Sequence, residues 1–227
     1  MKDIKRTYQE SPIFKKEEIQ EMMLRILYIY AKKNSYISYK QGMNELLAII
    51  LNLFLQSKEE FKNLQVKNET IDYLMDQEFL EHDVFTVFVA LMDKTSKWFE
   101  DKPQIPIRQG NSPKTQEEEL IDPSFYLPIS LQCNNIQNVI LRKYDQELFE
   151  HLKKFSIYPQ IYMLRWIRLL FARQSSLETI YYIWDAILAY CPNDKTLNFV
   201  DYISVAILEK IRSNGDLFFL FYTIFYI

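Results

Sequence analysis

Apolar residues recur at helical spacing along most of this 227-residue chain, and this periodicity limits the possible fold more than any other feature. Two segments show it most clearly, and their apolar positions are Ile19, Met22, Met23, Ile26, Leu27 and Tyr30 in one and Met43, Leu46, Leu47, Ile50, Leu51 and Phe54 in the other. Each set covers one face of an α-helix. Because the sequence also holds only three glycines, we expect an all-α protein, either one large domain or two packed helical subdomains.

The charge and the cysteine content argue against several classes of protein. A formal net charge of -3 offers no basic excess for binding a nucleic acid and no strong acidity that would favour disorder. Cys133 and Cys191 match no metal-binding spacing, so we expect buried thiols in a reducing, cytoplasmic compartment. The longest apolar runs, 46–55 and 218–227, are shorter than the roughly 20 residues of a transmembrane helix, which predicts a soluble protein. Because the last ten residues are almost wholly apolar and end without a helix cap, we expect a fragment or a truncated gene model.

Helical patterns and their breaks divide the chain into segments. In the first half we expect helices at 15–33 and 40–55, a charged loop at 56–67 and a helical region at 69–100. Residues 101–128 contain five prolines and no apolar period, so we expect an exposed loop where subdomains 1–128 and 129–227 meet. In the second half we expect one helix at 160–173 and another that starts at a Ser175-x-x-Glu178 capping box. Two further helices are expected at 197–212 and 216–227.

The stretch Tyr39-Lys40-Gln41-Gly42-Met43-Asn44 precedes one of the two clearest helical patterns. Its Gln-Gly pair would lie at a helix start, where free N–H groups and the positive end of the helix dipole suit a ligand that carries phosphate. Ser38-x-x-Gln41 also fits a capping box, in which Gln41 would bond only to the Ser38 backbone. The spacing leaves both interpretations open.

A second polar cluster, Glu81-His82-Asp83, has the residue types of a catalytic site. Adjacent residues on a helix point about 100° apart, so the three side chains cannot converge on one atom. We therefore interpret His82 as a structural residue that ties helices together by hydrogen bonds.

Conventional catalytic motifs are absent from the sequence, which has no Gly-rich phosphate loop, no His-x-x-x-His pair and no Gly-x-Ser-x-Gly elbow. An arginine, Arg6, and a glutamine, Gln41, remain as candidates. Neither side chain exchanges protons readily, but an arginine can offset charge that develops on a γ-phosphate and a glutamine can orient an attacking water. This pair suits phosphoryl transfer, with the nucleotide and magnesium held by a partner protein and no cofactor of the chain's own.

Taken in order, these motifs resemble the TBC-domain GTPase-activating proteins of Rab GTPases. Asp3-x-x-Arg6-Thr7 is similar to the second half of that family's Ile-x-x-Asp-x-x-Arg motif, and Tyr39-Lys40-Gln41-Gly42-Met43 is similar to its Tyr-x-Gln-Gly-Met motif. Residues 81–92, 164–170 and 183–186 also resemble familial segments, whereas the helices that the family places before the first motif are missing. The second motif continues here as Tyr-x-Gln-Gly-Met-Asn-Glu-Leu-Leu-Ala. This form of the motif and the proline-rich loop at 101–128 together most resemble the subgroup that includes member 5 of the human TBC1 family.

The resemblance implies a TBC-type helical fold, a site and a partner. Arg6 would be an arginine finger and Gln41 a glutamine finger, both entering the nucleotide site of a Rab GTPase, where Gln41 would replace the Rab's own water-orienting glutamine. Asp3 would hold the Arg6 segment, while Tyr39 and Gly42 would shape the Gln41 segment. Peripheral association with endosomal or other trafficking membranes would follow through the Rab. The alternatives are a catalytically weak Rab-binding adaptor and a helical scaffold without a GTPase partner.

Overall fold

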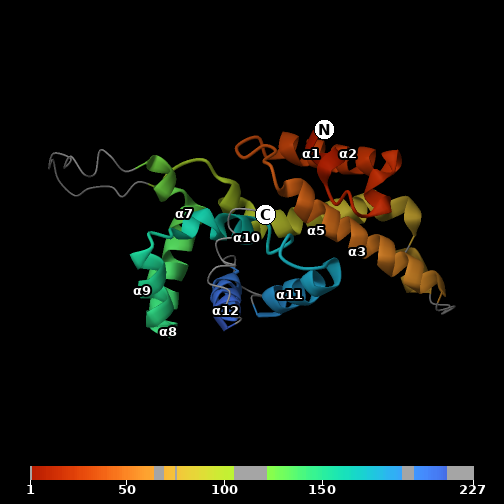
Figure 1. The fold of residues 1–227 in the computed structure, drawn as a ribbon. Coiled ribbons are helices and arrows are strands. Elements are labelled where there is room, and N and C mark those ends of the chain that lie inside the picture. The colour runs from red at the N-terminus through yellow and green to blue at the C-terminus, as the bar shows by residue number, and fades with distance from the viewer. Residues whose placement is uncertain (1, 64–68, 75, 105–121, 191–196, 214–227) are drawn as a thin grey trace. The chain divides into compact units, whose positions relative to one another are not determined.

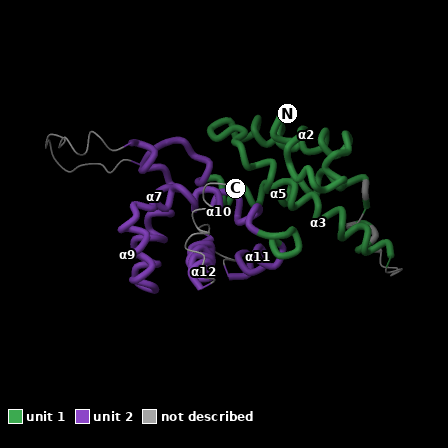
Figure 2. Tube along the Cα trace, viewed as in Figure 1, with its two compact units in different colours: residues 1–96, 175–180 green, residues 97–174, 181–227 purple. Residues whose placement is uncertain are grey.

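The structure is a computed structural model that describes residues 2–63, 69–74, 76–104, 122–190 and 197–213. Within these ranges every regular element is helical, which confirms the all-α prediction (Figure 1). The chain divides into two compact units, of which unit 1 comprises residues 1–96 and 175–180 and unit 2 comprises residues 97–174 and 181–227 (Figure 2). The subdomain division after residue 128 stays a prediction.

Unit 1 is built on three long helices, α2 (Glu17–Lys33), α3 (Met43–Asn63) and α5 (Leu80–Thr95). Shorter elements accompany them: α1 (Lys2–Arg6), η1 (Pro12–Lys15), α4 (Glu69–Leu74) and η2 (Gln77–Phe79). The apolar face of α3 is buried as its period predicts, and this helix contacts both α2 and α5. The ring of Tyr30 packs edge-on against Phe88, with 5.2 Å between centroids, and so joins α2 to α5.

The bounds of α3 differ from the predicted helix at both ends. It begins at Met43 and continues to Asn63, so the charged loop predicted at 56–67 is helical as far as the described residues reach. Glu, Lys and Gln are good helix formers, and their polarity alone does not end a helix. Lys58 anchors this turn, because its side chain is 2% exposed and its ammonium group donates to the Asp76 carbonyl and lies 3.9 Å from the Asp83 carboxylate. Burial lowers the pKa of Lys58.

Unit 2 consists mainly of short helical pieces. They are η4 (Pro123–Tyr126), α7 (Pro128–Asn135), the π-helical η5 (Ile136–Leu141), α8 (Arg142–Tyr144), α9 (Gln146–Lys154), η6 (Pro159–Ile161), α10 (Met163–Arg168), most of α11 (Leu177–Tyr190) and α12 (Phe199–Ser213). Trp98, fully buried, donates to Gln132 at 2.6 Å, and Gln132 donates to Asp201 at 2.7 Å. This partly buried chain of hydrogen bonds links the segment that contains Trp98 to α7 and α12.

The helix predicted at 160–173 is interrupted. It consists of η6 and α10, and the chain then turns at Leu170 and Phe171, which have φ angles of 46° and 63°. The Leu170 carbonyl accepts a hydrogen bond of 2.9 Å from the indole of buried Trp184. The following helix, α11, starts one residue later than the predicted capping box, because Ser176 rather than Ser175 accepts from the Thr179 N–H, at 3.4 Å.

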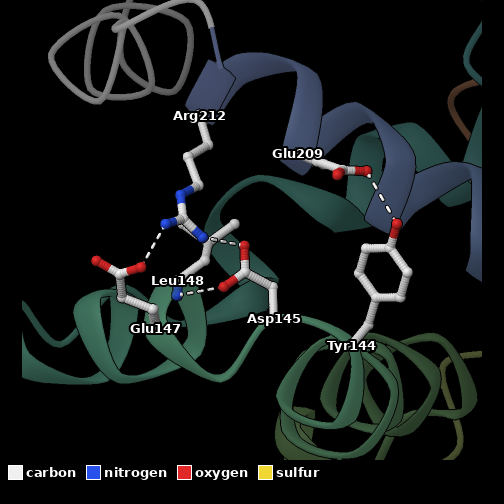
Figure 3. Close-up of polar contacts among 6 residues, drawn as sticks. All are labelled: Tyr144, Asp145, Glu147, Leu148, Glu209 and Arg212. Carbon is white, nitrogen blue, oxygen red and sulfur yellow. Dashed lines mark hydrogen bonds and ion pairs between the residues drawn. The ribbon is translucent and has the colours of Figure 1, made fainter.

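Polar contacts fix α9 to α12 within unit 2 (Figure 3). Asp145 caps α9 by accepting a hydrogen bond of 2.9 Å from the Leu148 N–H, and Arg212 near the end of α12 pairs with both Asp145 and Glu147. Burial by itself would raise the pKa of Asp145, but the hydrogen bonds from Leu148 and Arg212 outweigh it and leave that pKa below its ordinary value. The N-terminus of α9 is therefore anionic where the arginine of α12 approaches it.

Some predictions fall partly or wholly outside the described residues. These include most of the 101–128 loop, Cys191 and the helix at 216–227. Cys133 lies in the described part and is a buried thiol, as predicted, and burial raises its pKa to about 12. No helix among the described residues is long and apolar enough to cross a membrane.

Candidate functional site

The Arg6 segment, residues 2–8, consists of the short helix α1 and the first residues of the turn after it, and buried residues anchor it on both sides of Arg6. Ile4 is 4% exposed and Tyr8 is 5% exposed, and the Tyr8 ring packs 5.7 Å from Phe14. The Thr7 hydroxyl donates to the Asp3 carbonyl at 2.9 Å, which closes the helix turn. The Arg6 side chain itself is exposed. Buried neighbours therefore hold the backbone of this segment, while the Arg6 guanidinium is exposed to solvent.

The Gln41 segment, residues 39–44, leads into α3 through a turn that requires glycine. Gly42 is buried and has a φ of 106°, a conformation that a β-carbon would disfavour. Its carbonyl accepts the first hydrogen bonds of the helix, from the N–H groups of Glu45 at 3.0 Å and Leu46 at 3.3 Å. The predicted capping box is wrong, because the helix starts at Met43 and Ser38, at a φ of 60°, precedes that start by too many residues. The Gln41 side chain is exposed.

Asn44 connects the two segments through its side-chain amide. Its Nδ2 donates to the Thr7 hydroxyl at 2.8 Å, and its Oδ1 accepts from the Gly42 N–H at 3.1 Å. Thr7 directly follows Arg6, and Gly42 directly follows Gln41. Bonded in this way, the Arg6 and Gln41 Cα atoms can be at most about 17 Å apart. The two candidate fingers thus lie near each other in unit 1, on segments that are 35 residues apart in the sequence.

Tyr39 and Asp3 make a second link between the segments. The Tyr39 hydroxyl donates to Asp3 Oδ2 at 2.8 Å and lies 3.1 Å from Asn44 Oδ1. Burial, and then the hydrogen bond to the Asp3 carboxylate, raises the pKa of Tyr39 above its ordinary value. The hydroxyl therefore stays protonated as a donor at neutral pH. Asp3 and Tyr39 therefore bond to each other from one segment each, and their supporting role stays a prediction.

Thr7 and Asn44 lie within the two motifs, but no role was predicted for either of them. The sequence position of Asn44 could have indicated its importance. It is a polar residue next to Met43 and three residues before Leu47, which places it on the apolar, buried side of the predicted helix. It is 3% exposed and Thr7 is 1% exposed. Among the described residues, neither the Arg6 guanidinium nor the Gln41 amide has a hydrogen bond or ion pair. The hydrogen bonds of Asn44 therefore hold the segments that carry Arg6 and Gln41 without involving either of those side chains.

The Glu81-His82-Asp83 triplet does not form a converging site, as its helical spacing predicts. Glu81 makes a two-pronged ion pair with Arg25 of α2, with a shortest distance of 2.8 Å, and Asp83 faces Lys58 of α3. His82 is exposed, and its ring lies 6.5 Å from the Phe79 ring. The prediction that His82 ties helices together is wrong, since its two acidic neighbours do so. No group of three or more His, Cys, Asp or Glu side chains in the described ranges could hold a metal ion.

Comparison with known proteins gives the same family as the motifs. A model of the Rab-GTPase-TBC domain matches residues 1–111 and 113–215. The chain is 35% identical over 221 residues to human TBC1 domain family member 5, covering 92% of this chain and 27% of that protein. It is 29% identical over 302 residues to the Dictyostelium discoideum homolog B of member 5, covering 93% of this chain and 29% of that protein. The chain thus spans about a quarter of the length of these relatives.

The fold also matches a solved structure. The Ypt/Rab-GAP domain of Gyp1p superposes with a TM-score of 0.68 and 20% sequence identity, over 93% of this chain and 59% of that domain's chain. The match establishes a TBC-type helical fold, and the resemblance to the subgroup of member 5 is confirmed. The family model covers nearly all of the sequence, and the chain therefore belongs to the Rab-GTPase-TBC domain family.

Proposed function

We propose that this chain is a GTPase-activating protein for a Rab-family GTPase, and that it supplies Arg6 and Gln41 in trans. One observation carries the proposal: two exposed side chains suited to phosphoryl transfer lie on segments that the buried amide of Asn44 joins by hydrogen bonds to both. Family membership supports it, as does the name of the matched Ypt/Rab-GAP domain.

The chemistry assigns one task to each side chain. Arg6 would offset the negative charge that develops on the γ-phosphate oxygens as the bond to the leaving group breaks. Gln41 would orient the attacking water and so stand in for the Rab's own glutamine. GTP and magnesium would be held by the Rab, so the chain needs no cofactor of its own. The partner would also bring the chain to trafficking membranes, as a peripheral protein on their cytoplasmic side.

Single-turnover GTP hydrolysis across a panel of Rab proteins tests the proposal. The wild-type chain should accelerate at least one Rab, and Arg6→Ala should reduce the acceleration by on the order of 10³–10⁵. Gln41→Ala should also reduce it strongly. Binding to the same Rab with a non-hydrolysable GTP analogue should change little, because the fingers act chiefly on the transition state.

Two matched controls come from exposed residues of the same types. Gln56 is exposed on α3, outside the two finger segments, and Arg165 is exposed on α10. Gln56→Ala and Arg165→Ala should leave the stimulated rate near that of the wild type. A wild-type chain that binds a Rab without accelerating it would show a Rab-binding adaptor instead, and a chain that binds no Rab would show a scaffold.

A further inference from the structure

Asn44 is the most heavily used buried polar side chain of the candidate site. An asparagine amide has two donor hydrogens and an oxygen that can accept twice. Here the oxygen accepts from the Gly42 N–H and faces the Tyr39 hydroxyl, and the nitrogen donates to the Thr7 hydroxyl. Burying such a group is costly unless it is hydrogen-bonded, and at 3% exposure Asn44 has few other sources of partners.

The partners of Asn44 divide between the two finger segments. Thr7 belongs to the Arg6 segment. Its hydroxyl accepts the hydrogen bond from Asn44 and donates another to the Asp3 carbonyl, one helical turn earlier in the chain. Gly42 and Tyr39 belong to the Gln41 segment. The donor and acceptor ends of one amide, about 2.3 Å apart by its covalent geometry, therefore fix the two backbones relative to each other.

We propose that Asn44 is a positioning residue that sets the spacing and orientation of Arg6 relative to Gln41. The inference rests on the proposed function and deepens it. Both fingers must meet one γ-phosphate and one water at the same time, and a displacement of about 1 Å can cost roughly 10²-fold in rate. Asn44 touches neither the nucleotide nor the water in this proposal, and it acts only through the segments that it joins.

The isosteric change Asn44→Asp tests this role. Aspartate keeps the shape and the acceptor oxygen but cannot donate to the Thr7 hydroxyl, and it adds a negative charge close to the Asp3 carboxylate. Asn52 provides the matched control, because it lies on the same helix two turns further along and is 5% exposed. Asn52→Asp introduces the same change at a buried asparagine of α3 that lies outside the two finger segments.

The expected result is a loss in rate without a comparable loss in binding. With a responsive Rab, Asn44→Asp should lower the single-turnover rate at saturation by about 10²-fold and change the dissociation constant for the Rab with a GTP analogue by less than about threefold. Asn52→Asp should lower the urea midpoint and leave the rate of the folded protein unchanged. In a Gln41→Ala background, Asn44→Asp should cost less than in the wild type, since only one finger remains to be misplaced.

Three outcomes would overturn the inference. Asn44→Asp could unfold earlier yet stimulate hydrolysis at the wild-type rate while folded, which would make Asn44 structural only. It could lower the rate by the same factor with and without Gln41, which would mean that it does not act through the fingers. A wild-type chain that accelerates no Rab would remove the proposed function first, and that failure is visible before any variant is measured.

Discussion

At the residue scale, chemistry identified the two candidate fingers, but only the structure shows what surrounds them. Arg6 and Gln41 stand out in the sequence because arginine and glutamine together suit phosphoryl transfer. Thr7 and Asn44 could not be paired in the same way, since a hydrogen bond between residues 37 positions apart depends on the tertiary fold. The helix-cap interpretation of Gln41 failed for a local reason, because the positive φ of Gly42 delays the start of α3.

Removing the hydroxyl of Tyr39 should destabilise the protein more than removing the side chain of Gln41. Tyr39→Phe leaves a partly buried Asp3 carboxylate oxygen without its 2.8 Å donor and should lower the free energy of unfolding by about 1–3 kcal/mol. Gln41→Ala changes an exposed side chain and should stay within about 0.5 kcal/mol. Urea unfolding followed by far-UV circular dichroism measures both. The three tryptophans lie in unit 2, so tryptophan fluorescence would report mainly on the other unit.

If the two variants lost equal stability, the hydrogen bond from Tyr39 to Asp3 would not support the site. A large loss for Gln41→Ala alone would revive the interpretation of Gln41 as a structural residue, since a lost cap costs about 1 kcal/mol.

At the element scale, periodicity located most of the helices and misplaced several of their ends. The turn after α10 illustrates the limit. Leu170 and Phe171 adopt positive φ angles, which glycine would normally signal, and the sequence has no glycine there. Burial of both side chains and the hydrogen bond from the Trp184 indole to the Leu170 carbonyl compensate for that strain. These are tertiary contacts, which a local pattern cannot contain.

The contact between α9 and α12 should weaken in acid. Asp145 has a folded-state pKa below its ordinary value, so its stabilising effect is present above the unfolded pKa of about 3.9 and is lost as the pH falls through the folded pKa. Asp145→Asn keeps a capping oxygen and removes the charge that pairs with Arg212. The stability advantage of the wild type over this variant should therefore be constant near pH 6–7 and should shrink below about pH 4.

Thermal melts followed by tryptophan fluorescence between pH 2.5 and 7 check this expectation in unit 2. Asp145→Ala, which removes the cap as well, should lose about 1 kcal/mol more than Asp145→Asn near neutral pH. A wild-type advantage that stayed constant down to pH 2.5 would mean that the Asp145 carboxylate is not stabilised by Arg212.

At the scale of the whole molecule, apolar periodicity predicted the all-α fold, and the ordered combination of motifs indicated the family, although each motif is short. The family model matches residues 1–111 and 113–215, and the Gyp1p domain shares the fold at only 20% identity. The helical spacing of apolar residues can persist at such low identity because it depends only on which face of each helix is buried, not on which apolar residue stands there. The identity of the Rab partner cannot be predicted from any such periodic pattern in the sequence, since partner choice would depend on exposed side chains spread over a surface.

The most direct measurement uses a responsive Rab whose own water-orienting glutamine has been replaced by alanine. If Gln41 orients the water in trans, the wild-type chain should still accelerate single-turnover hydrolysis by this Rab at a rate comparable with that of the unmodified Rab. Gln41→Ala should then reduce the acceleration strongly with both forms. If the wild-type chain accelerates the unmodified Rab but fails with the alanine form, the Rab supplies its own glutamine and the two-finger account is contradicted.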